Sequence, residues 1–549
     1  MERACSSSSE NGYIKPRGSA SKNPAVSALQ DLLFYQLTGI GFYAKNAHEF
    51  KKTDKETNNK ITRLIYLTNK GINFSITTMI EAINEAYSLK NRVENLYKFM
   101  CKNMGEKPKK SPASGLIRPG ESLSQMVSQA NVINAQKSIK NSNFNIFAMQ
   151  EIIRQSLCSS ANYLEHIKAE ENLSQSFYTQ IYDLLDFLSN ENITLNDCQM
   201  YGLKAGELQT QVFETIISSY EKTYGLIEHK KVFAGLKKGN AILVVGDDYP
   251  FLKKLLEETQ DKNINIYTYG TLNYAHAFPE INKFKNLAGI YLGQYDNFAA
   301  DIENFPGVVV LTSGNIEELT DVFRGRIFAT ENISMLGVSK LEKDNIKPLI
   351  NAAYDAQGFE KDEQNCYVDI GFGIKEIEEY TEKLYNLIRE KKIKNILVFL
   401  GCSNLGEDKN YLKKIIKILP ETTLYITLDH AVSYNIDKKI KKIDGIPQIL
   451  NLGQFINLYS LIRMFFAVSG KIRKDINESG INITINLRGP DTIAALLMLM
   501  SLGIKNIKIN SEMPIYLTDT IINLFGKKYG LEKIYGAKID AKNIISKQA

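Results

Sequence analysis

The chain has 549 residues, which is enough for about three or four domains, each with its own hydrophobic core. Its hydrophobic fraction of 44% and charged fraction of 23% are typical of a soluble protein, and no apolar run is long enough to suggest a membrane span. The formal net charge is +6, but the lysines are dispersed, so neither nucleic acid nor a membrane is an expected partner.

Six cysteines occur singly along the chain, which argues against a disulfide framework and against a zinc ribbon. Residues 1–23 lack the apolar core of a signal peptide and are predicted to form a flexible leader. A cytoplasmic location with reduced thiols is therefore expected.

Residues 24–228 show apolar side chains at three- and four-residue spacing, which predicts an α-helical domain. Within it, residues 29–43 match residues 149–163 at an offset of 120 positions (149 − 29), and residues 66–74 match residues 187–195 at nearly the same offset. Two side-by-side copies of a helical hairpin or a three-helix bundle are predicted. The polar segment 102–143, which contains Pro and Gly, is predicted to be a mobile loop.

Beyond this region the pattern changes to short apolar strands that alternate with helices, which predicts parallel, doubly wound sheets. Two Rossmann-like domains are expected, over residues 229–358 and 359–549. The clearest unit is 395–434, where a strand, a helix closed by Pro420 and a second strand follow one another.

Ligands of such sheets bind at the carboxyl ends of the strands, so the residues just past the strands are candidate site residues. They are Asp247, Tyr269, Thr271, Asn315, Cys402, Asp429, His430, Gln454, Arg488 and Asp491. Cys402 and His430 could form a nucleophilic thiolate–imidazole pair, or Asp247, Cys402, Asp429 and His430 could bind one metal ion. Alternatively, Cys402 is a small residue at a tight turn after Gly401. No glycine-rich phosphate loop follows any strand.

The chain resembles the hybrid cluster proteins, also called prismane proteins or hydroxylamine reductases, which are related in fold to carbon monoxide dehydrogenases. The resemblance covers almost the whole chain, and long collinear matches carry it. They begin at Val26 (VSALQDLLFYQLTGIGFYA), Thr223 (TYGLIEHKKVFAGLKKGNAILVVGDD), Asn263 (NINIYTYGTLNYAHAFPEI), Arg324 (RGRIFAT), Leu400 (LGCSN), Asp444 (DGIPQILNLGQ) and Leu496 (LLMLMSLGIKNIKI). The resemblance implies an α domain of two three-helix bundles followed by two Rossmann-like domains.

The resemblance also implies two iron–sulfur clusters, but most of their ligands are changed in this chain. Four cysteines near the N-terminus are expected, and only Cys5 is present. At the second cluster the cysteine that carries a persulfide in the family is retained as Cys402, while Asp247 and His430 stand where other side chains ligate. Four further ligand positions fall on residues that are not the family's ligands, namely Thr271, Asn315, Phe455 and Gly489.

A degenerate family member is therefore predicted, without iron–sulfur clusters, acting as a non-catalytic partner or regulator. Its expected partner is another protein or further copies of the same chain in a homo-oligomer. The alternative is a hydroxylamine reductase-type enzyme with a rebuilt metal centre, for which Asp247, Cys402 and His430 are the candidate ligands and Cys402 and His430 the candidate catalytic residues. Phe455 is expected to be a buried aromatic that fills the former cluster cavity. The Cys402 thiol is expected either to be reactive in the cleft or to be buried and inert.

Overall fold

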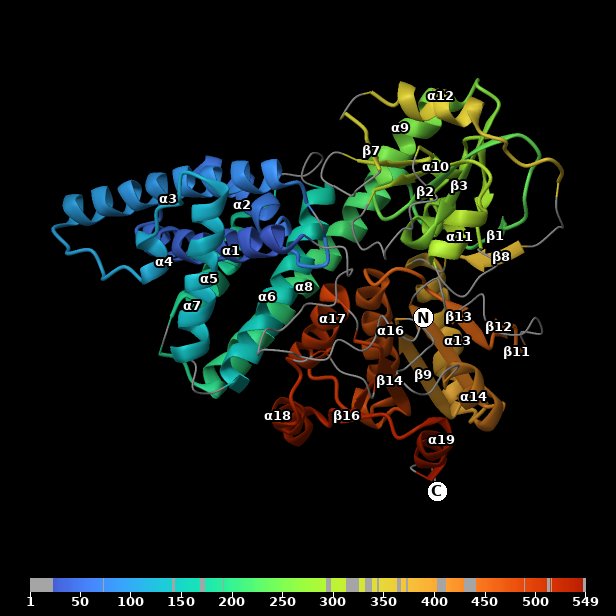
Figure 1. Cartoon of the computed structure of the whole chain (residues 1–549). Coiled ribbons are helices and arrows are strands. Elements are labelled where there is room, and N and C mark those ends of the chain that lie inside the picture. The colour runs from blue at the N-terminus through green and yellow to red at the C-terminus, as the bar shows by residue number, and fades with distance from the viewer. Residues whose placement is uncertain are drawn as a thin grey trace. The chain divides into compact units, whose positions relative to one another are not determined.

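The computed structural model describes residues 23–546, apart from residues 73, 141–143, 168–172, 191, 293–297, 313–324, 331–337, 343–344, 363–366, 372–373, 402–410, 429–440, 488, 511–513 and 515. The described residues form two compact units, and the division falls between Val212 and Phe213, within one long helix. Figure 1 labels most of the helices and many of the strands of both units.

The first unit is helical, as predicted (Figure 1). Its elements are α1 (Pro24–Glu49), α2 (Lys55–Tyr66), α3 (Ile76–Met104), α4 (Ala113–Leu116), α5 (Leu123–Lys140), α6 (Phe144–Ile167), α7 (Gln175–Ser189) and the first part of α8 (Leu195–Tyr224). None of the described helices combines the length and apolar composition needed to cross a membrane.

The predicted duplication is confirmed, because α1, α2 and α3 recur in the same order as α6, α7 and α8. Equivalent positions begin the third helix of each copy: the Ser75 hydroxyl accepts from the Thr78 N–H at 3.0 Å, and the Thr194 hydroxyl accepts from the Asp197 N–H at 3.2 Å. Such side-chain acceptors satisfy the amide groups that the first turn of a helix leaves without partners.

The two copies pack as if related by a two-fold axis. Helix α1 corresponds to α6, and α2 corresponds to α7. The first helix of each copy contacts the second helix of the other copy, α1 with α7 and α6 with α2, which is the reciprocal pattern of a symmetric interface. The offset of 120 makes Arg154 the equivalent of Phe34 (154 − 34), and the Arg154 guanidinium carbon lies 4.6 Å from the centroid of the Phe34 ring. A residue that meets its own equivalent in this way lies close to the axis.

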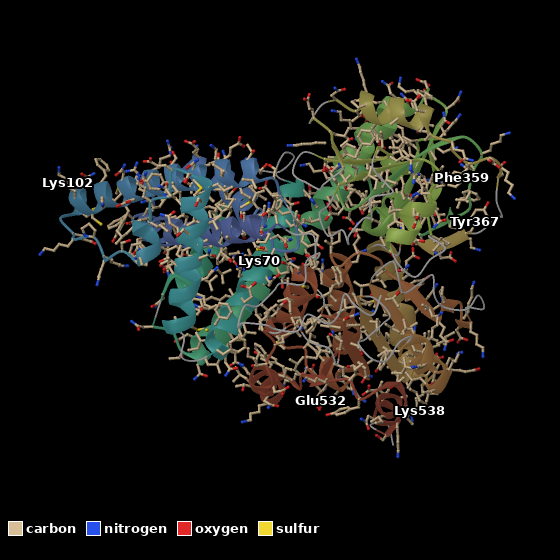
Figure 2. All side chains as sticks on the ribbon, viewed as in Figure 1. Lys70, Lys102, Phe359, Tyr367, Glu532 and Lys538 are labelled. Carbon is tan, nitrogen blue, oxygen red and sulfur yellow. The ribbon has the colours of Figure 1, made fainter. Side chains whose placement is uncertain are left out.

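A buried ion cluster lies beside this axis. The Asp31 Oδ1 atom is 2.7 Å from the Lys70 ammonium and 3.1 Å from Nη1 of Arg154, and Figure 2 labels Lys70. Burial alone would raise the pKa of Asp31, but the two cations and the hydrogen bond from Asn134 hold it well below its usual range. The carboxylate therefore stays ionised and joins α1 to α6.

The structure differs from the expected loop at residues 102–143, where α4 and α5 form. Helix α5 packs against α1 and buries Met126, Ala130 and Ile133, which follow one another at helical spacing. Polar Ser, Gln and Asn residues between them conceal this stripe in the sequence. Burial against α1 supplies the stabilisation that the weak local pattern does not.

The second unit holds two α/β domains, each built on a six-stranded sheet (Figure 1). The first sheet has the strand order β4-β3-β2-β5-β6-β7 and comprises β2 (Asn240–Val245), β3 (Ile264–Tyr269), β4 (Leu287–Ile290), β5 (Val308–Leu311), β6 (Ile327–Ala329) and β7 (Ser339–Lys340). Its helices are α9 (Tyr249–Thr259), η1 (Gly270–Ala277), α10 (Pro279–Asn282), α11 (Phe298–Asn304) and α12 (Lys347–Asp355).

The second sheet has the order β13-β10-β9-β14-β15-β16 and comprises β9 (Asn395–Leu400), β10 (Thr423–Leu428), β13 (Ile449–Asn451), β14 (Ile481–Ile485), β15 (Ile507–Ile509) and β16 (Glu532–Lys533). Its helices are α13 (Ile374–Arg389), α14 (Tyr411–Ile418), α16 (Asn457–Ile472), η3 (Ile476–Glu478), α17 (Pro490–Ser501), α18 (Asp519–Tyr529) and α19 (Ala537–Ser546). Two antiparallel pairs complete the unit: β1 (Lys230–Phe233) with β8 (Tyr367–Ile370), and β11 (Lys442–Ile443) with β12 (Ile446–Pro447).

Every strand pair within the two large sheets is parallel, so the predicted fold class is confirmed. The central strands β2, β5, β9 and β10 are almost wholly buried apolar runs, as expected for a sheet covered on both faces. On one face of the second sheet, α14 and α19 pack over Leu397, Phe399 and Tyr425.

Candidate functional site

The order of strands in the first sheet places Asp247 at a ligand-binding position. The chain passes from β2 outward to β3 and β4, then returns to the other side of β2 as β5, so the direction reverses between β2 and β5. Asp247 follows β2 after Gly246, whose φ of 131° turns the chain away from the sheet. The next residue, Asp248, caps α9 by accepting from the Phe251 N–H at 2.8 Å. Asp247 is thereby held, half-buried, at this switch point.

The second sheet has the same kind of switch point between β9 and β14. Gly401 follows β9 with φ of 93°, and a Cβ atom at this position would lie 3.1 Å from the Cβ and carbonyl oxygen of Asn486 at the end of β14. Glycine is therefore required for the turn. Cys402 is the next residue along the chain, and it lies outside the described residues.

The carboxyl edges of the two sheets are joined by residues at the end of β13 and just beyond it. The Gln454 side-chain amide donates to the backbone carbonyl of Thr271 at 3.1 Å and to the hydroxyl of Tyr249. Tyr274 donates through its hydroxyl to Oδ1 of Asn451 at 2.5 Å. These contacts bring the ends of β2 and β3 against the end of β13, so the two edges form one continuous region.

Gly453 allows this close approach. Its φ is 80°, and a Cβ atom built on it would come within 1.8 Å of two carbon atoms of the Tyr274 ring. The ring therefore lies directly on the Gly453 backbone. No side chain larger than hydrogen fits without displacing Tyr274.

A buried aromatic cluster stands beside Asp247. Tyr220 and Tyr224 from α8 pack against Tyr249, with ring centroids 5.0 Å and 5.9 Å from the Tyr249 ring, and Phe278 closes the cluster. Burial raises the pKa of Tyr220 well above its usual value, and the neighbouring tyrosines and the carboxylate of Asp247 raise it further. The phenol of Tyr220 therefore stays protonated, and the packed rings are buried from solvent.

The residues predicted to carry chemistry fall partly outside the described part of the chain. Cys402, His430 and Asn315 lie there, as do Asp429 and Arg488. Of the candidate metal ligands only Asp247 is described, and the described residues contain no group of three or more His, Cys, Asp or Glu side chains placed to hold a metal ion. Whether Asp247, Cys402 and His430 share one centre therefore remains a prediction.

Three further positions, at which the resemblance implies cluster ligands, are described. Phe455 is half-buried rather than fully buried, so it differs from the expected cavity-filling aromatic. Gly489 is extended, with φ of −164°, and no heavy atom lies within 4 Å of a Cβ atom built on it. Thr271 uses its backbone carbonyl to accept from Gln454.

None of these three residues offers a thiolate or carboxylate, and soft thiolates are the ligands that select iron–sulfur clusters. The described residues therefore do not fit a thiolate-bound iron–sulfur cluster. The carboxylate of Asp247 suits a harder cation better than a cluster iron.

A helical N-terminal region followed by two α/β domains, each with a parallel six-stranded sheet, defines the class of fold to which the chain belongs. The match to the model of the Prismane/CO dehydrogenase family spans residues 2–542. The chain belongs to this family.

Relatives named hydroxylamine reductase align with almost the whole chain. The protein from Methanocella arvoryzae is 27% identical over 528 residues, which covers 96% of this chain and 96% of the relative. The protein from Thermodesulfovibrio yellowstonii is 28% identical over 535 residues, covering 96% and 97%.

Solved structures agree with the fold. Carbon monoxide dehydrogenase IV from Carboxydothermus hydrogenoformans superposes with a TM-score of 0.55 at 11% identity, over 97% of this chain and 89% of that one. An acetyl-CoA synthase/carbon monoxide dehydrogenase with NiZn[Fe4S4] and NiNi[Fe4S4] clusters gives 0.56 at 12% identity, over 99% and 87%.

These comparisons correct one expectation. The sequence predicted a chain without a cofactor, and that prediction is wrong: the family and its structural neighbours point to a metal cofactor.

Sequence reasoning identified Gln454 as a strand-end residue but missed Tyr249, Tyr274 and Asn451. Tyr274 and Tyr249 come from a short 3-10 helix and the start of an α-helix, and their roles depend on contacts with residues about 180 to 200 positions away. The signal that was available is the sequence Asn451-Leu452-Gly453 after a short strand, which suggests a turn that needs a positive φ.

Proposed function

We propose that this protein is a metal-dependent reductase of the hydroxylamine reductase type, with a centre rebuilt around Cys402. Asp247 and His430 are the proposed additional ligands. The observation that carries the proposal is the junction of the two sheet edges by Gln454 and Tyr274, which brings the Asp247 switch point against the second sheet. End-to-end alignment with relatives named hydroxylamine reductase supports the substrate class.

The residues of the site would act on the substrate by binding and by excluding water. Reduction of hydroxylamine to ammonia and water takes up two electrons and two protons, which an external one-electron donor and the solvent must supply. A bound metal would supply the redox chemistry. The buried rings of Tyr220, Tyr224 and Tyr249 shield one side of the site, and the Gln454 bridge keeps the two edges at a fixed separation.

The test is hydroxylamine turnover by the full-length protein purified without oxygen, with reduced methyl viologen as electron donor. The proposal expects turnover that is lost in Cys402→Ser but retained in Cys198→Ser. Cys198 is a suitable control because it is fully buried in α8, where burial raises the pKa of its thiol to about 12. Equal activity of the two variants would contradict a centre at Cys402.

The second candidate function is that of a non-catalytic partner or regulator of a related protein. The observation in its favour is that Phe455 and Gly489 present no donor at positions where the resemblance implies ligands. A protein that retains metal but shows no turnover, and that co-purifies stoichiometrically with a related chain, would support this alternative.

A further inference from the structure

The amino edge of the second sheet, where its strands begin, is strongly basic. All six strands are parallel, so the segments that precede them reach this one edge. These segments carry 13 Lys and Arg residues and 5 Asp and Glu residues, a net charge of +8 (13 − 5), whereas the whole chain carries +6. The excess positive charge of the protein therefore lies here. The basic edge comprises residues 389–394, 417–422, 441–448, 471–480, 502–506 and 526–531.

Hydrogen bonds join the segments of the basic edge into one continuous surface. Neighbouring strands lie about 4.8 Å apart, so the six strands spread the cations over about 24 Å. The joining bonds, at 2.9–3.2 Å, run from Gln448 to Glu421, Lys394 to Thr422, Ile396 to Gly480, Asn477 to Gly503 and Asn506 to Tyr529.

Part of this charge has a local structural explanation. Basic residues in the last turn of a helix complement the helix dipole, and such residues end α13, α14, α16 and α18. Two lysines of the turns, Lys392 and Lys441, pair with carboxylates of the same edge. Neither explanation covers the exposed cations of the turns that have no carboxylate partner among the described residues. They are Lys391, Lys442, Arg473, Lys474 and Lys505.

The composition of the basic edge favours one kind of anionic partner. Of its 13 cations, 11 are Lys and 2 are Arg. Protein interfaces are enriched in Arg and aromatic side chains and depleted in Lys, and single-stranded nucleic acids stack on aromatic side chains. The described residues of the basic edge include no exposed aromatic side chain. They do include Ile418, which is 40% exposed next to Lys417. An apolar side chain among lysines suits the interface of a bilayer better than a phosphate backbone.

We propose that the basic edge binds the surface of a membrane that contains anionic phospholipid. The lysines face the headgroups, and Ile418 enters the boundary between headgroups and acyl chains. Lysine suits this role because its compact charge needs no fixed partner geometry. The expectation that no membrane is a partner rested on the dispersal of lysines along the sequence, but the six segments come together in the folded sheet. The candidate site lies at the opposite, carboxyl edge, so this proposal does not depend on the metal centre.

The experiment is sedimentation of the full-length protein with vesicles of phosphatidylcholine that contain about 30% phosphatidylserine, at about 0.1 M salt. The edge variant changes Lys442, Lys474 and Lys505 together to Gln. Each lysine near an anionic bilayer strengthens binding by a factor of about five, so the edge variant is expected to bind about a hundredfold more weakly. Its melting temperature should equal or exceed that of the parent protein, because like charges along the edge repel one another.

The matched control changes Lys52, Lys107 and Lys110 to Gln. These lysines are exposed in the first unit, and the control has the same net charge as the edge variant, +3 (6 − 3). It is expected to bind the anionic vesicles as the parent protein does. Ile418→Ser is expected to weaken binding about threefold to eightfold, since part of its apolar side chain no longer leaves water.

Sedimentation with the anionic vesicles and not with pure phosphatidylcholine, weakened in the edge variant and retained in the control, supports the proposal. Absence of sedimentation, or equal weakening in the edge variant and the control, overturns it. Tighter binding to double-stranded DNA or to polyglutamate than to the vesicles at the same salt also overturns it, and assigns the basic edge to nucleic acid or to an acidic protein. Equal binding by Ile418→Ser and the parent protein overturns the choice of a bilayer over another polyanion.

Discussion

Replacing Gly453 with alanine should destabilise the second unit strongly, because two penalties act at one position. An alanine at φ of 80° costs about 1–2 kcal/mol relative to glycine. The new methyl group would also overlap the Tyr274 ring, since the Cβ position lies 1.8 Å from two of its carbon atoms. Displacing a buried ring costs about 1–3 kcal/mol, and loss of the Tyr274–Asn451 hydrogen bond about 1 kcal/mol more. The total is about 3–6 kcal/mol.

Gly503→Ala is the control that isolates the overlap. Gly503 has a similar φ of 76°, but no heavy atom lies within 4 Å of a Cβ atom built on it. This variant should therefore lose only the conformational part, about 1–2 kcal/mol. Urea unfolding followed by far-ultraviolet circular dichroism measures both variants, and Gly453→Ala combined with Tyr274→Ala should recover part of the loss. Equal destabilisation by Gly453→Ala and Gly503→Ala would refute the close packing of Tyr274 on Gly453.

Three further predictions concern other positions in the second unit. Phe455→Ala should lower the free energy of unfolding in urea by about 1–2 kcal/mol, because Phe455 is half-buried. A fully buried aromatic would lose about 3–5 kcal/mol. A loss in that higher range would support the cavity-filling role that the sequence predicted for Phe455. Burial lowers the pKa of His276 to about 3, so the folded state stays neutral at this position while the unfolded state takes up a proton below about pH 6.5. Stability should therefore fall as the pH is lowered from about 6.5 towards 3, and His276→Asn should flatten this dependence between pH 7 and pH 5. Gly489→Glu should change the free energy of unfolding by less than about 1 kcal/mol, because the position is open and its φ suits any residue. The new carboxylate should also slow the loss of metal to a chelator. Faster loss of metal from this variant would argue against a metal centre near Gly489.

The sequence predicted the strands of the second unit closely because buried parallel strands are short, continuous apolar runs. The expected strand–helix–strand unit over residues 395–434 contains β9, α14 and β10. The antiparallel pair of β1 with β8 was not predicted, since it joins segments more than 130 residues apart. Helix α5 was missed because only three well-spaced apolar residues mark its buried face.

The site was predictable only as a location. Strand ends identify Asp247, Cys402 and Gln454 as neighbours of a binding edge because parallel strands share one carboxyl edge. Which partner each residue contacts depends on distances that no spacing rule provides. The contact of Tyr274 with Asn451, for example, spans 177 positions of the chain.

The most direct test of the central proposal is X-ray absorption spectroscopy, combined with metal analysis, on full-length protein purified without oxygen. A centre rebuilt around Cys402, Asp247 and His430 predicts stoichiometric metal whose first shell contains a cysteine sulfur scatterer together with oxygen or nitrogen, and predicts that Cys402→Ser removes the sulfur contribution. Protein without metal, or a first shell that Cys402→Ser leaves unchanged, would contradict the proposal.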